Sequence, residues 1–457
     1  FYSLYLKLVN FVLEKTFLEK MEEMGWIENH HRKIQVPNLP QRVFIWDETL
    51  RDGEQMPGVV LTPEDKLEIA KMLDEIGVSI IAIGMPFVSA GDKRAIQLVV
   101  EEGLKNAKIA VPARALLSDV KMAVDVGAEE IPIFLATSKL RLEKDYRKNL
   151  DLLVDKFLIP SIEYAKDHGV IVDFVTEDAT RSKLDMLVDV YKRAIEAGAD
   201  KIVIADTVGF ARPDVIKLIV RYVKNKLGNN ERISYAIHCH NDFGLAVANT
   251  LAAVEEGVEY PHVTVNGYGE RSGNAALEEV VMALEILYGV KTGIKLDKLY
   301  ELSKFVEKKF LIPLQRHKPI VGENSFAHES GIHVHAILSN PLSYEPFPPS
   351  LIGRKRKIYI GKHSGKKSLA YFLIKTLQAI DNKEGSLYIK VGKKEIILNE
   401  EKLADVLQAM KTDLEMKTIE LKNEYESNFI EILNKLKKLR FNINEKDVIK
   451  HLTKFEK

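Results

Sequence analysis

The sequence predicts an α/β protein whose largest part is a (β/α)8 TIM barrel, with a helical extension before it and small subdomains after it. From residue 43 onward, short β-branched runs alternate with amphipathic stretches eight times in roughly 250 residues, which matches such a barrel in both count and length. Glycine separates helix from strand in the segments VDVGA, IEAGA and VEEGV. A doubly wound open sheet also alternates strands and helices, but no GxGxxG motif follows the first run.

The eight strands are expected at 43–47, 78–84, 107–113, 130–136, 170–175, 200–206, 233–238 and 262–267. In TPEDKLEIAKMLDEIG (62–77), apolar residues recur at helical spacing, with Thr62 as N-cap, Pro63 at the first helical position and Gly77 at the end. We expect a helical extension over 1–40 and the barrel over 41–292. The remaining segments are a linker helix (296–310) within a subdomain (293–370), then a C-terminal region (371–457) with a hairpin (386–398) and helices (403–439).

The composition excludes several classes of protein. Lys and Arg number 66 against 66 Asp and Glu, so the formal charge of zero gives no general attraction to nucleic acid or to anionic membranes. The single cysteine excludes an internal disulfide framework and suits a reducing compartment. The apolar start of the chain is interrupted by Lys7, Glu14 and Lys15 and lacks the cleavage site of a signal peptide. We therefore expect a soluble, cytoplasmic protein without nucleic-acid or membrane partners.

The segment HCHND (238–242) lies at the end of a predicted strand and contains that cysteine, Cys239. Because successive side chains of a strand face opposite sides, His238 and His240 share one face and Cys239 points away from it. The chemistry of such barrels lies at the carboxyl ends of the strands, where the first strand leads into DETLRDGEQ (47–55). Asp52 and the two histidines would form a two-His, one-carboxylate set that binds a divalent cation and leaves positions open for substrate oxygen.

Five segments resemble one enzyme family: DETLRDGEQMPGV, EDATRS, ADTVGFARP, HCHNDFGLAVANTLAAVEEG and NGYGERSGNAALEEVVMAL. They are similar to the metal-dependent Claisen-condensing synthases, which include 2-isopropylmalate, homocitrate and citramalate synthases. The resemblance runs from about residue 43 to about residue 370. It implies that acetyl-CoA condenses with a 2-oxo acid at a divalent cation (Mg, Mn or Zn) and that CoA is released. It also implies a homodimer, in which the small subdomain reaches the active site of the partner subunit.

The same resemblance implies roles for individual residues. Arg51 would stabilise developing negative charge, and His333, oriented by Glu177, would be the catalytic base. Tyr344 matches an active-site tyrosine of the family. The residues expected to bind the 2-oxo acid or to lie beside the metal are Gln55, Arg141, Thr207 and Asn274. His328 and His335 match no functional position of the family, and we expect them to be structural or surface residues.

The sequence leaves the 2-oxo acid open. GERSGNAALEEVVMAL is closest to isopropylmalate and citramalate synthases, whereas TSKLR (137–141) and YEPFPPSLIGRKRK (344–357) resemble homocitrate synthases. There, an arginine after the TSK stretch meets the distal carboxylate of 2-oxoglutarate; Arg141 lies one residue away from that spacing, and its alternative is a solvated surface residue. We expect 2-oxoisovalerate, a precursor of leucine, with 2-oxoglutarate, a precursor of lysine, as the alternative and the citramalate reaction third.

Three further possibilities are disfavoured. Lyases acting on hydroxymethylglutaryl-CoA have a related barrel and the same metal set, but they carry a cysteine in the glycine loop that is NGYGERSGN here. A non-enzymatic scaffold would show losses at the barrel mouth, and none is visible in the sequence. The region after residue 370 is shorter and richer in Lys and Glu than the family's regulatory domain, so feedback inhibition by leucine is not implied.

Overall fold

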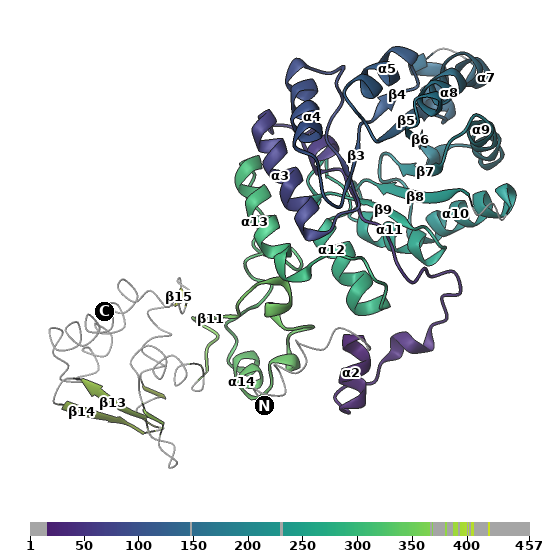
Figure 1. The fold of residues 1–457 in the computed structure, drawn as a ribbon. Coiled ribbons are helices and arrows are strands. Elements are labelled where there is room, and N and C mark those ends of the chain that lie inside the picture. Colours follow the sequence, from purple (N-terminus) through teal and green to yellow (C-terminus); the bar gives the residue numbers. More distant parts are fainter. Residues whose placement is uncertain are drawn as a thin grey trace. The chain divides into compact units, whose positions relative to one another are not determined.

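The computed structural model describes residues 16–146, 149–228 and 232–365, together with short stretches between residues 366 and 420. The chain divides into two compact units between Gly322 and Glu323. The first unit holds the strands and helices of the barrel (Figure 1), and the second begins at Glu323. Within the described part of the chain, no helix is both long enough and apolar enough to cross a lipid bilayer.

Nine strand segments of the first unit form one closed parallel sheet. They are β1 (Trp46–Asp47), β2 (Ile80–Ala82), β3 (Lys108–Ala110), β4 (Ala113–Arg114), β5 (Glu130–Ala136), β6 (Ile171–Glu177), β7 (Lys201–Asp206), β8 (Ser234–Cys239) and β9 (Tyr260–Val263). Their order is β3-β2-β1-β9-β8-β7-β6-β5-β4, and a β3–β5 pairing closes the ring. β3 and β4 are two parts of one barrel strand, separated at Pro112, which lacks the N–H that a continuous ladder needs. The predicted eight-stranded barrel is confirmed.

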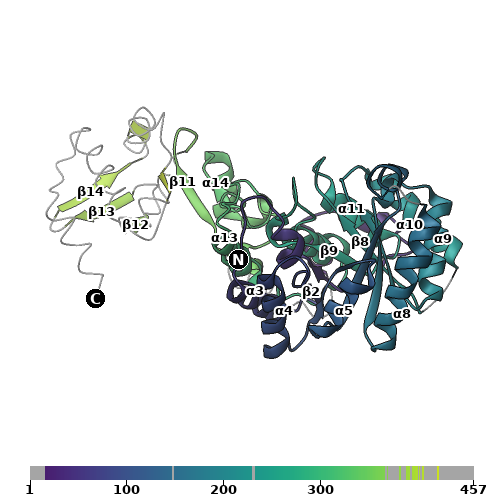
Figure 2. The same cartoon turned by 90° about the horizontal axis from the view of Figure 1, so that it is seen from above.

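Helices surround the barrel on its outside (Figures 1 and 2). The main ones are α3 (Pro63–Ile76), α4 (Ala90–Glu102), α5 (Leu117–Asp125), α8 (Ile159–Asp167), α9 (Leu184–Glu196), α10 (Pro213–Leu227), α11 (Ala246–Glu255) and α12 (Leu277–Met282). Two short helices, α6 (Lys139–Arg141) and α7 (Leu150–Leu153), lie in the connection between β5 and β6. α3 begins as predicted: the Thr62 side chain accepts from the Asp65 N–H, and the Asp65 side chain accepts from the Thr62 N–H.

Every second residue of a barrel strand points inward, so the interior is built of successive layers of side chains. The layer at the base is charged, and the layer above it is apolar. At the base, Lys201 of β7 forms ion pairs with Glu130 of β5 (2.5 Å) and Asp173 of β6 (3.1 Å), and all three are buried. Lys201 also lies 5.8 Å from the ring of Trp46, across the barrel on β1. The inward residues two and four positions further along β5 are Pro132 and Phe134, so an apolar layer lies above the charged base.

The strand expected at 262–267 ends earlier than predicted. β9 stops at Val263, and a turn follows in which Asn266 has a φ of 64°, a left-handed conformation that cannot continue a strand. The Asn266 side chain is buried and donates to the carbonyl oxygen of Ser303 at 3.0 Å. The early end of β9 releases the glycine-rich loop that follows it.

The linker helix expected at 296–310 is α13 (Leu299–Phe310), preceded by a turn at Leu296–Lys298. Lys309 forms 2.7 Å ion pairs with Asp65 and Glu68 of α3, so this helix packs on the barrel and belongs to the first unit. Of the expected N-terminal helical extension, the described part is α2 (Phe17–Glu23). The segment before residue 16 lies outside the described residues.

Among its described residues, the second unit holds the helix α14 (Gly331–Ser339) and two small sheets. In the first sheet, β10 (Ala327–His328) runs parallel to β11 (Lys357–Ile360), which pairs antiparallel with β15 (Ile419–Glu420). The hairpin predicted at 386–398 is present as β13 (Leu387–Val391) and β14 (Lys394–Leu398), with β12 (Ile380–Asp381) beside β13. The helices predicted at 403–439 lie almost entirely outside the described residues.

Candidate active site

The segment after β1 forms a single turn of π-helix, Thr49–Gly53. Such turns are rare and occur frequently at functional sites, where the extra residue changes the direction of a side chain. Thr49 anchors the turn: its hydroxyl donates to Asp47 at 2.8 Å and accepts from the Val265 N–H at 2.8 Å. The turn thereby carries Arg51 and Asp52 to the carboxyl end of the barrel, against the loop that follows β9.

Asp52 meets the two histidines of β8. Its Oδ2 lies 3.1 Å from His238 Nε2 and 3.5 Å from His240 Nε2, and the two nitrogens are 3.3 Å apart. A cation that holds N and O ligands at about 2.0–2.2 Å separates neighbouring ligand atoms by about 3.0–3.5 Å. The three atoms therefore have the spacing of ligands that share one cation. Cys239 does not belong to this group; it is buried, and burial raises the pKa of its thiol.

Asn274 completes the polar surroundings of Asp52. Its Nδ2 donates to Asp52 Oδ2 at 2.8 Å, whereas its Oδ1 is buried without a hydrogen-bond partner in the described structure. His240 Nδ1 is likewise buried without a hydrogen-bond partner in the described structure. Asp52, His238 and His240 together offer one carboxylate oxygen and two imidazole nitrogens that converge, which is a donor set for a divalent cation. The residues present fit a divalent cation.

Two glycines hold the loop after β9 close to Asn274. A Cβ atom added to Gly269 would lie 1.8 Å from Asn274 Oδ1, and one added to Gly273 would lie 1.9 Å from the Gly267 carbonyl oxygen. Backbone approach this close leaves no room for any side chain. The glycines of NGYGERSGN therefore fix the position of Asn274.

The charges at the mouth favour the protonation states of metal ligands. Burial alone would raise the pKa of Asp52, but Arg51 and the two histidines hold it well below the usual range. Burial and the neighbouring His238 lower the pKa of His240 to about 4. An ionised carboxylate and a neutral imidazole are the forms that bind a cation, so these groups need not release protons near neutral pH.

A cavity of about 180 Å3 extends from this site into the barrel. Its polar lining is Glu48, Arg51, Gln55, Glu177, Thr207, His238, His240 and His262, and its apolar lining is Met85, Pro112, Pro132, Phe134, Val175 and Ala205. Thr207 Oγ1 accepts from the Asp178 N–H at 2.8 Å, which leaves the threonine proton free to be donated to a ligand. Arg141 does not line the cavity; its Nη2 lies 3.9 Å from Glu177 Oε2.

Two residues expected at the site lie in the second unit. His333, on α14, is exposed, and its ring stacks on that of Tyr344 with centroids 4.0 Å apart. Glu177 belongs to the first unit, so the predicted pairing of His333 with Glu177 stays a prediction. The other two histidines fit their expected roles: His335 is exposed, and buried His328 lies 3.4 Å from Glu345 Oε1.

Comparisons with known proteins identify the family of this chain. The sequence profile of the HMGL-like family matches residues 42–306, and that of the homocitrate synthase post-HMGL domain matches residues 320–418. The chain is 47% identical over 374 residues to 2-isopropylmalate synthase from Methanocaldococcus jannaschii, covering 82% of this chain and 68% of that protein. The chain belongs to the family of 2-isopropylmalate, citramalate and homocitrate synthases. It is therefore an enzyme.

Other relatives of this synthase differ in their named substrates. Citramalate synthase from M. jannaschii is 45% identical, covering 76% of this chain and 70% of its own. Homocitrate synthase from Methanopyrus kandleri is 47% identical, covering 73% and 82%. The crystal structure of a hydroxymethylglutaryl-CoA lyase from Bacillus subtilis superimposes with a TM-score of 0.55 at 22% identity, covering 61% of this chain and 97% of that one, and shows the shared fold alone. Identity thus leaves the substrate of this synthase open.

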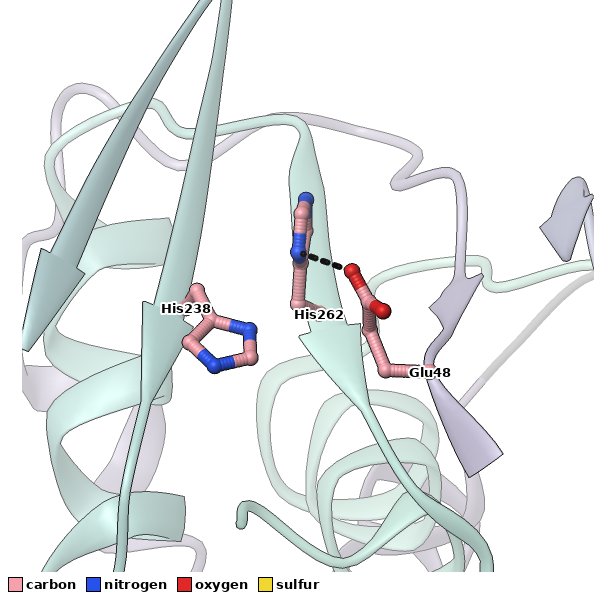
Figure 3. A group of neighbouring side chains, drawn as sticks. All are labelled: Glu48, His238 and His262. Atoms are coloured by element: carbon pink, nitrogen blue, oxygen red, sulfur yellow. Dashed lines mark ion pairs between the residues drawn. The ribbon is translucent and has the colours of Figure 1, made fainter. Parts of the chain in front are cut away.

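The site of this synthase includes two residues that the sequence did not single out. Figure 3 shows the carboxylate of Glu48 facing the ring of His262, with His238 beside them. Glu48 Oε1 lies 3.3 Å from His262 Nδ1, and both side chains are buried. These three residues form a second group that could hold a metal ion. A signal for His262 existed: it is the first residue of the run HVTVNG, where strand alternation allows an inward side chain.

Proposed function

We propose that this synthase condenses acetyl-CoA with 2-oxoisovalerate at a divalent cation held by Asp52, His238 and His240, forming 2-isopropylmalate and free CoA. The apolar wall of the cavity is the observation that carries the choice of substrate. Arg51 is the one Lys or Arg residue among the described residues that line the cavity. Burying the distal carboxylate of 2-oxoglutarate without a cation would cost several kcal/mol, whereas an isopropyl group fits an apolar wall.

At the mouth of the barrel, Thr207, Arg51 and Gln55 would each make a different contact with the substrate. A bound divalent cation polarises a carbonyl group and stabilises negative charge on its oxygen. Thr207 would donate its hydroxyl proton to the carboxylate of the 2-oxo acid, because its oxygen already accepts from the Asp178 N–H. Arg51 would place its terminal N–H groups on the oxygen that becomes negative during the attack. Gln55, which also lines the cavity, would add a hydrogen bond to the same ligand.

Acetyl-CoA must lose a methyl proton before it can attack the 2-oxo acid. We assign the base to His333 and its orientation to Glu177, on the basis of the family resemblance. The stack on Tyr344 supports this role, because it fixes the plane of the imidazole while the ring remains exposed. His333 can then receive a proton from a ligand that approaches from outside its own unit.

The proposal includes a homodimer in which His333 acts at the barrel of the partner subunit. Mixing an inactive Arg51→Ala chain with an inactive His333→Ala chain, under conditions of subunit exchange, should restore part of the activity. Each mixed dimer would contain one site with both residues intact. Verified mixed dimers without any activity would contradict a site shared between subunits.

Homocitrate synthesis is the second candidate. The profile match at residues 320–418 and the relative from M. kandleri favour it. For 2-oxoglutarate to bind, a cation would have to face the apolar wall, and Arg141 is the nearest candidate in the sequence motif. In the structure the guanidinium of Arg141 is turned toward Glu177. Glu177 lines the cavity, so Arg141 lies next to the cavity without lining it.

A CoA-release assay distinguishes the candidates. The purified enzyme is supplied with acetyl-CoA and, in separate reactions, with 2-oxoisovalerate, 2-oxoglutarate, pyruvate or oxaloacetate, with and without added Mg, Mn or Zn. We expect the highest kcat/KM with 2-oxoisovalerate and no release without metal. A preference for 2-oxoglutarate or pyruvate would replace the isopropylmalate assignment, and release that persists after complete metal removal would contradict the proposed role of the cation.

A further inference from the structure

Glu48 is a buried carboxylate at the mouth to which the proposed reaction gives no role. Its Oε2 accepts a hydrogen bond from Arg51 Nε at 2.7 Å, and its Oε1 lies 3.3 Å from His262 Nδ1, close enough for contact but without hydrogen-bond geometry. The side chain of Glu48 is 2% exposed, so these contacts are shielded from water. A charge-assisted hydrogen bond in such surroundings is stronger and more directional than one at the surface.

The bond to Glu48 determines how Arg51 is presented. Of the guanidinium nitrogens, Nε is held by Glu48, and Nη1 lies 3.9 Å from Asp52 Oδ1. In the described structure the two terminal nitrogens donate no hydrogen bond to the protein, and Arg51 lines the cavity. Because the guanidinium is planar, fixing Nε also fixes the direction of the four terminal N–H bonds. Glu48 thus leaves those donors for a ligand.

The His262 ring lies beside Glu48 and is itself fixed by other rings. It stacks on Trp46 with centroids 4.2 Å apart, and it meets the His238 ring at 5.5 Å. Trp46 is fully buried among barrel side chains, including Ile80 and Ala110. The imidazole is therefore packed between Trp46 and His238, with its Nδ1 3.3 Å from Glu48 Oε1.

A second metal site at Glu48, His238 and His262 is the competing interpretation of this group. The guanidinium of Arg51 lies 2.7 Å from the Glu48 carboxylate, so a cation placed there would be repelled by a fixed positive charge at close range. The contacts favour an orienting role over metal binding.

We infer that Glu48, held by His262, is a positioning residue that aims the guanidinium of Arg51 at the substrate. The inference rests on the proposed function, because Arg51 has a role only if a ligand with developing negative charge enters the cavity. It adds to that function a chain of contacts from the barrel interior to the reacting centre: Trp46, His262, Glu48 and Arg51. A carboxylate of this length is required, because it must reach His262 and Arg51 together.

The test compares Glu48→Gln and Glu48→Asp with wild type, using whichever 2-oxo acid the wild type turns over. Both should lower kcat by up to about 100-fold, the effect of displacing a catalytic group by about 1 Å. Bound metal should stay at the wild-type level, and KM for acetyl-CoA should change little.

In an Arg51→Lys background, which has no Nε, Glu48→Gln should have almost no further effect. Glu256→Gln is the matched control, since Glu256 pairs with Arg221 between α10 and α11, outside the cavity.

Several results would overturn the inference. Activity of Glu48→Gln within twofold of wild type, or effects of Glu48→Gln and Arg51→Lys that simply multiply, would exclude action through Arg51. Loss of bound metal in Glu48→Gln would assign Glu48, His238 and His262 to a cation instead.

A crystal structure of Glu48→Gln gives a readout independent of turnover. Arg51 should have moved, and an unmoved guanidinium would contradict the inference even if no tested 2-oxo acid were a substrate. If Glu48→Gln fails to fold, His262→Gln gives the same comparison with a smaller expected loss, because the Glu48–Arg51 bond remains.

Discussion

The rings of His333 and Tyr344 stack with centroids 4.0 Å apart and planes inclined by 27°. The stack joins a residue of α14 to one that follows the next short turn, Pro341–Ser343, so it is formed entirely within the second unit. Tyr344 is 45% exposed, which means that contact with His333 rather than burial fixes its position. This relationship makes the contribution of Tyr344 measurable without disturbing the barrel.

We predict that Tyr344→Phe keeps kcat within about twofold of wild type, whereas Tyr344→Ala lowers it by about 2- to 10-fold, the equivalent of one aromatic stack. His333→Ala should abolish CoA release while leaving metal content unchanged. Steady-state kinetics and metal analysis of the three variants provide the measurement. Equal losses in Tyr344→Phe and Tyr344→Ala would show that the tyrosine hydroxyl, not the stack, is what matters.

The proposed metal ligands can be separated from their neighbour Cys239. Asp52→Ala and His238→Ala should lose bound metal and CoA release, because each removes one of three converging ligand atoms. Cys239→Ser should retain both within a few-fold, since the thiol lies outside this group. Metal analysis of the dialysed proteins is the direct measurement. Metal loss in Cys239→Ser would refute the assignment of ligands.

Arg141 tests the choice of substrate. We predict that Arg141→Ala leaves kcat/KM for 2-oxoisovalerate nearly unchanged, because Arg141 does not line the cavity. A substitution that changes the apolar wall by the size of one methyl group should alter the ratio of kcat/KM between two 2-oxo acids by only about 10- to 200-fold. The measurement is kcat/KM with 2-oxoisovalerate and 2-oxoglutarate for wild type and variant. A wild-type preference for 2-oxoglutarate that Arg141→Ala selectively removes would establish homocitrate synthesis.

The charged base of the barrel should make stability depend on pH. Burial, followed by the neighbouring Glu130, raises the pKa of Asp173 well above its usual range. The folded protein then keeps a proton that the unfolded chain releases near pH 4, so this contribution to stability is lost as pH rises from about 4 toward the folded pKa. Asp173→Asn should flatten that decline in the free energy of unfolding.

Lys201→Met provides a contrasting variant in the same charged layer at the bottom of the barrel. It should destabilise the protein by about 3–5 kcal/mol, because it removes the buried cation that contacts Glu130 and Asp173. Denaturant unfolding between pH 5 and 9 measures both variants. An unchanged pH profile in Asp173→Asn would show that Asp173 is ionised in the folded state.

The sequence predicted the parts of the site that lie on one strand or in one motif. Alternation within β8 was enough to place His238 and His240 on the same face, because that rule needs no knowledge of the fold. The contact between Glu48 and His262 could not be found in this way. They meet because the barrel closes β9 against β1, where Trp46 and His262 are paired in register. Such a contact depends on the register between distant strands, which no local pattern carries.

For Asn274 and Arg141, the sequence indicated a role but not the contacts that each side chain makes. Resemblance placed Asn274 near the metal shell, but only the structure shows its Nδ2 bound to Asp52 and its Oδ1 without a partner. For Arg141, motif spacing left two interpretations open, a substrate contact and a solvated surface residue, and both stay predictions. The structure turns Arg141 toward Glu177. Side-chain direction is set by neighbours from other strands and loops, so it had to be observed.

The close packing of Gly269 and Gly273 limits how the loop after β9 can be redesigned. A side chain at Gly269 would collide with Asn274, and one at Gly273 would collide with the backbone at Gly267. An engineer who wished to graft a nucleophile such as cysteine into this loop has only the three residues between the two glycines to use. Of these, Ser272 is exposed and differs from cysteine by a single atom, so it is the natural starting point for building a nucleophile into this loop.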